Sequence, residues 1–281
     1  MDSSMLLLKN AVKLLLIISL LSVSQGYAKG HRVPVPSKKE TILATSYMVQ
    51  DIDTGEVIVE KNSDEIRSIA SITKLMTAIV VLDAKQELEE YILVKPIKGL
   101  HSRMQNTRRS RAELITLALM SSDNLAAEVL ALNYPGGKDA AVSAMNRKSK
   151  QLEMTNTSFV EPTGLANENV STVQDLVKLV RASEQYHFVK YASTSRNLLV
   201  SMPDKKQSTY IEFHTTNRLI NSIPEIVISK TGWIRNSGGC LLMGIHDQGR
   251  RLAVILLNSK NTHTRFRDGE LLYGLKHGKS I

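Results

Sequence analysis

A serine and a lysine three residues apart form the first pair of side chains whose types and spacing suit catalysis. In a helix this spacing places the hydroxyl of Ser71 and the amine of Lys74 on one face, one turn apart. A serine becomes a good nucleophile when a base removes its proton, and an amine is such a base only when burial or a second cation lowers its pKa. Taken alone, the pair also fits a helix-capping serine followed by an exposed lysine.

A second polar cluster, Ser122-Asp123-Asn124, lies between two predicted helices. A turn at this point would aim Ser122 and Asn124 into a cleft floored by the helix that begins near Ser71. A hydroxyl can relay a proton and a carboxamide can hold a substrate amide. The alternative is an ordinary turn between helices.

A third cluster, Lys230-Thr231-Gly232, ends a predicted strand. Gly232 would let a bound backbone approach the strand edge, and Thr231 could bind a carboxylate. Lys230 is the second cation that could lower the pKa of Lys74, and the backbone amide of Trp233 could join that of Ser71 as an oxyanion hole. The alternative is a strand end with an exposed lysine.

The elements that must position these clusters follow from hydrophobic periodicity. Alternation around the turn at Asp53 predicts a hairpin over residues 45–60, and a buried helix begins near Ser71. A further helix is expected to begin at Ser171, because Ser171 and Gln174 have the spacing of a capping box. The remaining predicted helices span 111–120, 125–132 and 138–152, the predicted strands span 226–230, 241–246 and 252–257, and an amphipathic segment runs on to Leu275. Strands at both ends with helices between them predict an α/β (α+β) arrangement in which the two ends of the chain close one sheet.

In chain order, the three clusters resemble the Ser-x-x-Lys, Ser-Asp-Asn and Lys-Thr-Gly signatures of penicillin-binding proteins and class A β-lactamases. The chain from about 40 to 260 resembles the low-molecular-mass D-alanyl-D-alanine peptidases, and within them the endopeptidase branch. Segments that carry this resemblance include the stretches at 69–77, 161–165, 216–219 and 230–233, with 118–122, 133–137 and 239–241 for the branch.

The resemblance implies a β-lactamase/transpeptidase-like fold, with an antiparallel sheet flanked by helices and a helical subdomain. It implies that Ser71 is the nucleophile, Lys74 the general base and Ser122 the proton relay. It also implies that Asn124 contacts the substrate amide and that Lys230, Thr231, Gly232 and Trp233 bind the substrate. The implied partners are peptidoglycan peptides and β-lactam inhibitors, with no metal or other cofactor.

Four other functions remain open at this point. A D-Ala-D-Ala carboxypeptidase would share every motif, and a non-catalytic β-lactam sensor domain could keep all three. A serine β-lactamase needs a Glu-x-x-Leu-Asn loop, where this chain has Glu161-Pro-Thr-Gly-Leu165. A metal peptidase is disfavoured because the seven histidines form no His-Glu-x-x-His pair.

The first 28 residues read as a secretory signal peptide, which leaves 29–281 as the penicillin-binding catalytic domain. Two lysines precede the apolar run 14–23, and small residues at Gly26 and Ala28 precede the expected cleavage site. No later stretch is long and apolar enough for a transmembrane anchor. A periplasmic location is therefore expected.

Charge and cysteine content bound the partners further. Residues 1–28 carry two lysines and one aspartate, so the remainder has a formal charge of +8. The basic segment 95–111 lacks interleaved aromatics, which argues against nucleic acid. It is expected to be a solvated face or a contact for a polyanionic envelope polymer, and Arg103 to Arg111 are candidates for receiving the group beyond the scissile bond. Cys240, the single cysteine, is expected to be a packed thiol.

Overall fold

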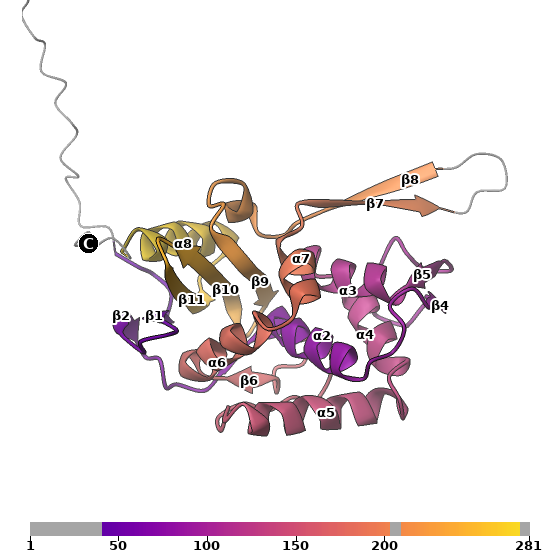
Figure 1. Cartoon of the computed structure of the whole chain (residues 1–281), viewed down its shortest axis with the longest axis horizontal. Helices are drawn as coiled ribbons and strands as arrows, with labels where there is room; N and C mark the ends of the chain where they lie inside the picture. Colours follow the sequence, from indigo (N-terminus) through magenta and orange to yellow (C-terminus); the bar gives the residue numbers. More distant parts are fainter. Residues whose placement is uncertain (1–40, 203–208, 276–281) are drawn as a thin grey trace, which may run out of the picture. The chain divides into compact units, whose positions relative to one another are not determined.

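A five-stranded antiparallel sheet joins the two ends of the described chain (Figure 1). The structure, a computed structural model, describes residues 41–202 and 209–275. The predicted hairpin forms β1 (Ser46–Asp51) and β2 (Val57–Lys61), and the C-terminal third supplies β9 (Ile226–Ile234), β10 (Gly238–Asp247) and β11 (Arg250–Ser259). The strand order β2-β1-β11-β10-β9 pairs β1 with β11, as a sheet closed by both ends requires, and leaves β9 at an edge. The expected α+β arrangement is confirmed.

Each face of the sheet contributes to a separate apolar core, because side chains alternate across a strand. Leu242 and Ile255 lie in the larger core, which also contains the residues of α2 (Thr73–Asp83) and α6 (Val173–Ser183). Leu241 and Val254, one position away, lie in a smaller core with the apolar side chains of α8 (Thr262–Leu275). The central strands are therefore buried on both faces, which explains their nearly continuous apolar sequences.

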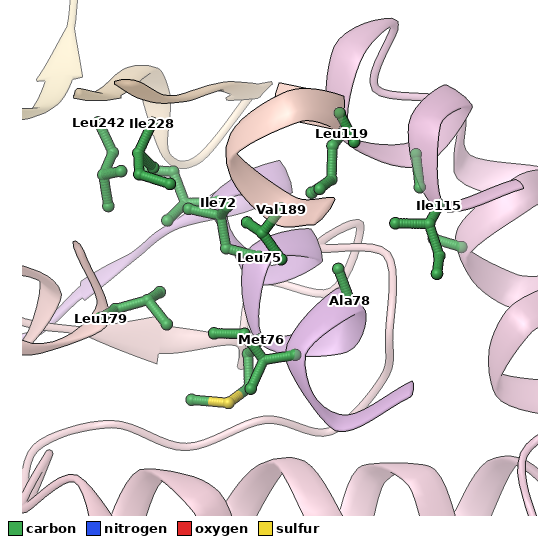
Figure 2. Close-up of a cluster of buried hydrophobic side chains, with 14 of the residues drawn as sticks. Ile72, Leu75, Met76, Ala78, Ile115, Leu119, Leu179, Val189, Ile228 and Leu242 are labelled. Atoms are coloured by element: carbon green, nitrogen blue, oxygen red, sulfur yellow. The ribbon is translucent and has the colours of Figure 1, made fainter. Parts of the chain in front are cut away.

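Helix α2 forms the centre of the larger core and is buried along almost its whole length. Figure 2 shows Leu75 and Met76 of this helix, and Ile72 immediately before it, among side chains of α3, α6, α7 and the sheet. The helices packed against α2 include α3 (Arg111–Met120), α4 (Asn124–Leu132), α5 (Gly137–Gln151) and α7 (His187–Thr194). Such packing fixes the direction in which the first turn of α2 presents Lys74 and the preceding turn presents Ser71.

Short paired strands complete the described fold. They are β3 (Arg67–Ser68) with β6 (Val170–Ser171), β4 (Tyr91–Leu93) with β5 (Arg108–Ser110), and β7 (Asn197–Met202) with β8 (Thr209–His214). Two 3₁₀ turns, η1 (Ala70–Ile72) and η2 (Arg218–Asn221), lie beside the signature clusters. Helix α7 and the β7–β8 hairpin were not predicted from the sequence.

The predicted capping box at Ser171 is wrong. Ser171 belongs to β6, and the N-cap of α6 is Thr172, whose hydroxyl accepts the backbone N–H of Asp175. The short strand pairing takes Ser171 out of the helix, and the next hydroxyl-bearing residue caps instead. A capping box does form at Ser110 and Glu113, at the start of α3.

Across residues 41–202 and 209–275, the helices include none of the length and apolarity that crossing a membrane requires. The predicted signal peptide at 1–28 lies outside the described residues.

Candidate active site

Ser71 lies in the 3₁₀ turn η1 that leads directly into α2. Ala70, immediately before it, has a φ of +47°, which an alanine adopts only at a cost of roughly 1–3 kcal/mol when the surroundings enforce it. The hydroxyl of Thr73 donates to the Ala70 carbonyl at 2.8 Å, and the amide of Ile69 donates to Asn169 at 3.1 Å. These contacts hold the turn so that Ser71 stays partly exposed above a buried helix.

Lys74 is fully buried beneath Ser71 and contacts three acceptors. Its Nζ lies 2.8 Å from Ser71 Oγ, 2.7 Å from Asn124 Oδ1 and 2.6 Å from the carbonyl oxygen of Thr163. The expected pairing of Ser71 with Lys74 is thus present, and Asn124 lies against the same amine. The exposed lysine of the alternative interpretation is ruled out.

Burial lowers the pKa of Lys74 to about 7, and the negative charges of Glu161 and Asp123 oppose this shift. Near neutral pH a substantial fraction of the amine is therefore unprotonated and able to accept the Ser71 proton. Burial or a second cation was expected to lower this pKa, and burial is the largest cause. The pKa of Lys230 is also lowered, first by burial and then by the positive charge of Lys74.

The Ser-Asp-Asn cluster forms the turn between α3 and α4, as predicted. Ser122 has a φ of +59°, and Asp123 caps α4 by accepting the amide of Ala126 at 2.8 Å. Asp123 also accepts the hydroxyl of Ser102 at 2.5 Å. This capped turn presents Ser122 and Asn124 on the side facing α2.

The Lys-Thr-Gly cluster lies in edge strand β9. The Nζ of Lys230 is fully buried and donates to Ser122 Oγ at 2.9 Å and to the Thr231 carbonyl at 2.8 Å. A Cβ added at Gly232 would lie 3.0 Å from the backbone nitrogen of Ser71, so the glycine permits the close approach of β9 to the η1 turn. The three clusters therefore meet and form two serine–lysine pairs. Ser71 of η1 pairs with Lys74 of α2, and Ser122 of the α3–α4 turn pairs with Lys230 of β9.

A cleft of about 260 Å³ opens at this junction. It is lined by Ser71, Ser122, Asn124, Leu165, Thr216, Thr231, Gly232, Trp233, Thr262 and Arg265. All eight predicted site residues contribute to this region: six line the cleft, and Lys74 and Lys230 lie buried directly behind Ser71 and Ser122.

Arg265 in α8 is a cleft residue that was not predicted from the sequence. This side chain lines the cleft, donates from Nη1 to the Gly232 carbonyl at 2.9 Å and stacks on the Phe266 ring at 4.6 Å. Its Nε is buried without a hydrogen-bond partner, and burial lowers its pKa. Thr216 was also missed as a lining residue, although its segment carried the family resemblance, and its hydroxyl lies 2.6 Å from that of Thr231. Arg265 reaches the cleft from a helix about thirty residues after the Lys-Thr-Gly cluster, so no local sequence motif marks it as a site residue.

The loop Glu161–Leu165 lies against Ser71 and Lys74. Gly164 has a φ of +83°, and a Cβ there would lie 2.0 Å from the Ala70 carbonyl oxygen. Only glycine fits this contact. Both oxygens of Glu161 accept hydrogen bonds within the loop, including the amides of Thr163 at 2.7 Å and Gly164 at 2.5 Å. The Glu161 side chain therefore stabilises the conformation of this loop.

Two expectations outside the cleft have different outcomes. Cys240 is fully buried in β10, and burial raises the pKa of its thiol, as expected for a packed side chain. The basic segment 95–111 is only partly a solvated face. Arg109 and Arg111 are buried, Arg109 donating to the Ser201 carbonyl at 2.6 Å and Arg111 pairing with Glu90, because they join β5 and α3 to neighbouring segments.

Among the described residues, no three His, Cys, Asp or Glu side chains converge as metal ligands would.

Comparisons with known proteins identify the family of this chain. The profile of the D-alanyl-D-alanine carboxypeptidase family matches residues 33–261. The chain is 40% identical over 267 residues to a D-alanyl-D-alanine endopeptidase of Escherichia coli, covering 92% of this chain and 85% of that protein. It is also 40% identical over 241 residues to a D-alanyl-D-alanine endopeptidase of Pseudomonas aeruginosa, covering 83% and 77%.

A solved structure of similar fold is penicillin-binding protein D2 from Listeria monocytogenes in its ampicillin-bound form. The TM-score is 0.74 at 26% identity, covering 85% of this chain and 99% of that one. The buried serine–lysine pair, the extent of the sequence match and the shared fold together place this chain in the D-alanyl-D-alanine carboxypeptidase family of serine DD-peptidases.

Proposed function

We propose that this protein is a D-alanyl-D-alanine endopeptidase that hydrolyses D-alanyl cross-links of peptidoglycan through an acyl-enzyme on Ser71. The observation that carries the proposal is the contact of Ser71 Oγ with a buried amine whose pKa is about 7. The preference for cross-links rests on the endopeptidase names of the two relatives that share 40% identity.

In the acylation step, Ser71 Oγ attacks the carbonyl carbon of the D-alanyl residue and its proton passes to Lys74 Nζ. The backbone amides of Ser71 and Trp233 stabilise the oxyanion. The carbon–nitrogen bond then breaks, and the leaving amine takes a proton that Ser122 relays from Lys74. Water hydrolyses the resulting ester and restores the Ser71 hydroxyl.

Substrate binding is assigned to the remaining residues of the cleft. Asn124 holds the substrate amide, and β9 at Gly232 and Trp233 lies beside the extended peptide. Lys230 supplies a buried positive charge next to Ser122, and Thr231 contacts the carboxylate beyond the scissile bond. Arg265 adds a second cation for that carboxylate, since its side chain lines the cleft.

We expect Arg265→Gln to raise KM for a peptide with a carboxylate next to the scissile bond by about ten- to a hundredfold, with a smaller change in kcat. This range corresponds to the loss of one charge-assisted hydrogen bond. Steady-state kinetics on the acid and on its carboxamide analogue measure the effect, and the carboxamide should lose much less. Arg267→Gln, which removes the same charge from the same helix, serves as the control. Equal losses for both substrates would remove Arg265 from carboxylate binding.

The compartment proposed for this activity is the periplasm, where peptidoglycan lies. The basis is the signal-peptide pattern of residues 1–28, with residues 29–281 as the mature catalytic domain.

A D-Ala-D-Ala carboxypeptidase is the second candidate, favoured by the family description and by the relatives that carry that name. A β-lactamase is less well supported. The Glu161 carboxylate accepts five hydrogen bonds from residues 163–169, so its lone pairs are already engaged and none is left to activate a deacylating water.

Purified cross-linked muropeptide dimers and monomeric pentapeptides distinguish the two peptidases. We expect a higher kcat/KM for the dimer, measured by mass identification of products. A clear preference for the monomer would make the protein a carboxypeptidase, and turnover of neither, with penicillin acylation intact, would make it a sensor. Arg109 and Arg111 are buried, so only exposed cations such as Arg103 and Arg108 remain to make the dimer preference depend on salt.

A further inference from the structure

The carbonyl of Thr163 is a fixed acceptor for the catalytic amine. It lies 2.6 Å from Lys74 Nζ, and the next residue, Gly164, lies against the Ala70 carbonyl with no room for a side chain. The loop therefore contacts both Lys74 and the turn that carries Ser71. Any shift of this loop would move the Thr163 carbonyl off the amine.

Glu161 holds the loop in this conformation. Its Oε2 accepts the amide of Thr163 at 2.7 Å and the hydroxyl of Thr163 at 2.6 Å. Its Oε1 accepts the amides of Gly164 at 2.5 Å and Ala166 at 3.4 Å. One carboxylate thus orients the two peptide planes that flank Thr163, and the second of these planes contains the Thr163 carbonyl.

Asn169 ties this arrangement to helix α2. It is fully buried, and its Nδ2 donates to Glu161 Oε1 at 2.9 Å, to the Glu161 carbonyl at 2.9 Å and to Thr73 Oγ1 at 3.1 Å. Thr73 immediately precedes Lys74. Glu161 is therefore anchored to the same helical turn whose lysine the Thr163 carbonyl contacts.

The anchored Thr163 carbonyl also determines where the lone pair of the neutral Lys74 amine points. A neutral amine has two N–H groups and one lone pair, whereas Lys74 Nζ has three neighbours: Ser71, Asn124 and Thr163. The Asn124 and Thr163 oxygens accept only, so they take the two N–H groups. The lone pair is then left for the hydroxyl of Ser71.

We propose that Glu161 is a positioning residue for acylation: by fixing the Thr163 carbonyl on Lys74, it directs the lone pair of the neutral amine at Ser71. The inference rests on the proposed function, because it assumes that Lys74 is the base for Ser71.

The charges around Lys74 make the pH dependence of acylation a suitable readout, because a purely structural role of Glu161 would leave it unchanged. The charged groups around it are Glu161 from the loop and Asp123 from the α3–α4 turn, which raise its pKa, and Lys230 from β9, whose own pKa the Lys74 charge lowers. The Glu161 charge raises the pKa of Lys74, opposing burial. A neutral side chain at 161 should therefore lower the pKa of Lys74, and the neutral base should persist at lower pH.

The test measures the second-order rate of acylation by a labelled penicillin from pH 5 to 9. For Glu161→Gln we expect the acid limb of the pH–rate profile, where the rate rises with pH, to move to lower pH by about half a unit or more. We expect the plateau rate to fall about tenfold or more, because the amine is less well oriented. Glu161→Asp keeps the charge but shortens the side chain, so its acid limb should stay in place while its plateau falls.

Asp175→Asn is the matched control. Asp175 is also a buried carboxylate that fixes a neighbouring loop segment, accepting the amide of Asn156 at 2.8 Å and the hydroxyl of Thr157 at 2.9 Å. It does not contact Lys74. We expect a lower Tm in this variant, with the acid limb unmoved.

An unmoved acid limb in Glu161→Gln, or an equal movement in Asp175→Asn, would overturn the inference. If Glu161→Gln fails to fold, Glu161→Asp decides, and a wild-type plateau would contradict the proposal. Failure of the underlying function is a separate outcome: wild-type protein labelled at a residue other than Ser71 would refute the serine–lysine mechanism itself.

Discussion

Replacement of Ser71 by alanine is expected to abolish covalent labelling by penicillin and all peptide turnover. The activated hydroxyl should open a strained lactam as it opens an acyl-D-alanyl bond, because Ser71 Oγ lies 2.8 Å from an amine with a pKa of about 7. Gel fluorography of a labelled penicillin, followed by peptide mapping, measures the loss and locates the label in the unmodified protein.

Two serines provide controls for that result. Ser68, whose Oγ is buried without a hydrogen-bond partner, lies three residues before Ser71, and Ser68→Ala should label normally. Ser122→Ala should slow labelling without abolishing it, because Ser122 relays a proton and forms no covalent bond in the proposed mechanism. Label retained after Ser71→Ala, or mapped to Ser68 or Ser122, would assign the nucleophile elsewhere.

Replacement of Lys74 by arginine is expected to reduce the acylation rate by about 10² or more. Arginine keeps the positive charge and approximate reach, but a guanidinium does not deprotonate, so the general base is lost. Stopped-flow or quenched acylation by a labelled penicillin measures the rate. Lys230→Arg is the matched control, because Lys230 is equally buried and a permanent cation suffices for its proposed electrostatic role. A near-normal rate in Lys74→Arg would move the base to another group.

The pH dependence of the wild-type enzyme follows from the same lysine. Lys74 acts when neutral, and its pKa is about 7, so acylation should be slow below pH 6 and rise with pH through about 7. The pH–rate profile of acylation checks this sign, and a rate that fell as pH rose through 7 would contradict a neutral lysine base.

Local sequence patterns alone predict much of the fold. Helix α3 has the predicted bounds of 111–120, and the hairpin at Asp53 forms where alternation indicated it. Strands β9 to β11 form over the predicted apolar segments, because the hydrophobic pattern is a property of neighbouring residues. The cap of α6 was misplaced by one residue, since Ser171 pairs with Arg67, a partner far away in the chain. The β7–β8 hairpin was missed, because its residues Leu199 and Tyr210 are exposed and give no clear alternation.

The sequence by itself determined which side chains are the candidates for the chemistry, because Ser71, Lys74, Ser122 and Lys230 belong to compact motifs whose order along the chain is distinctive. Tertiary structure alone decided how those groups are tuned. Burial in the core, rather than a second cation, lowers the pKa of Lys74, while contacts across many residues bring the Thr163 carbonyl and Arg265 to the site. Desolvation and long-range approach depend on which segments pack together, and this information is not present in the local sequence around any one of these residues.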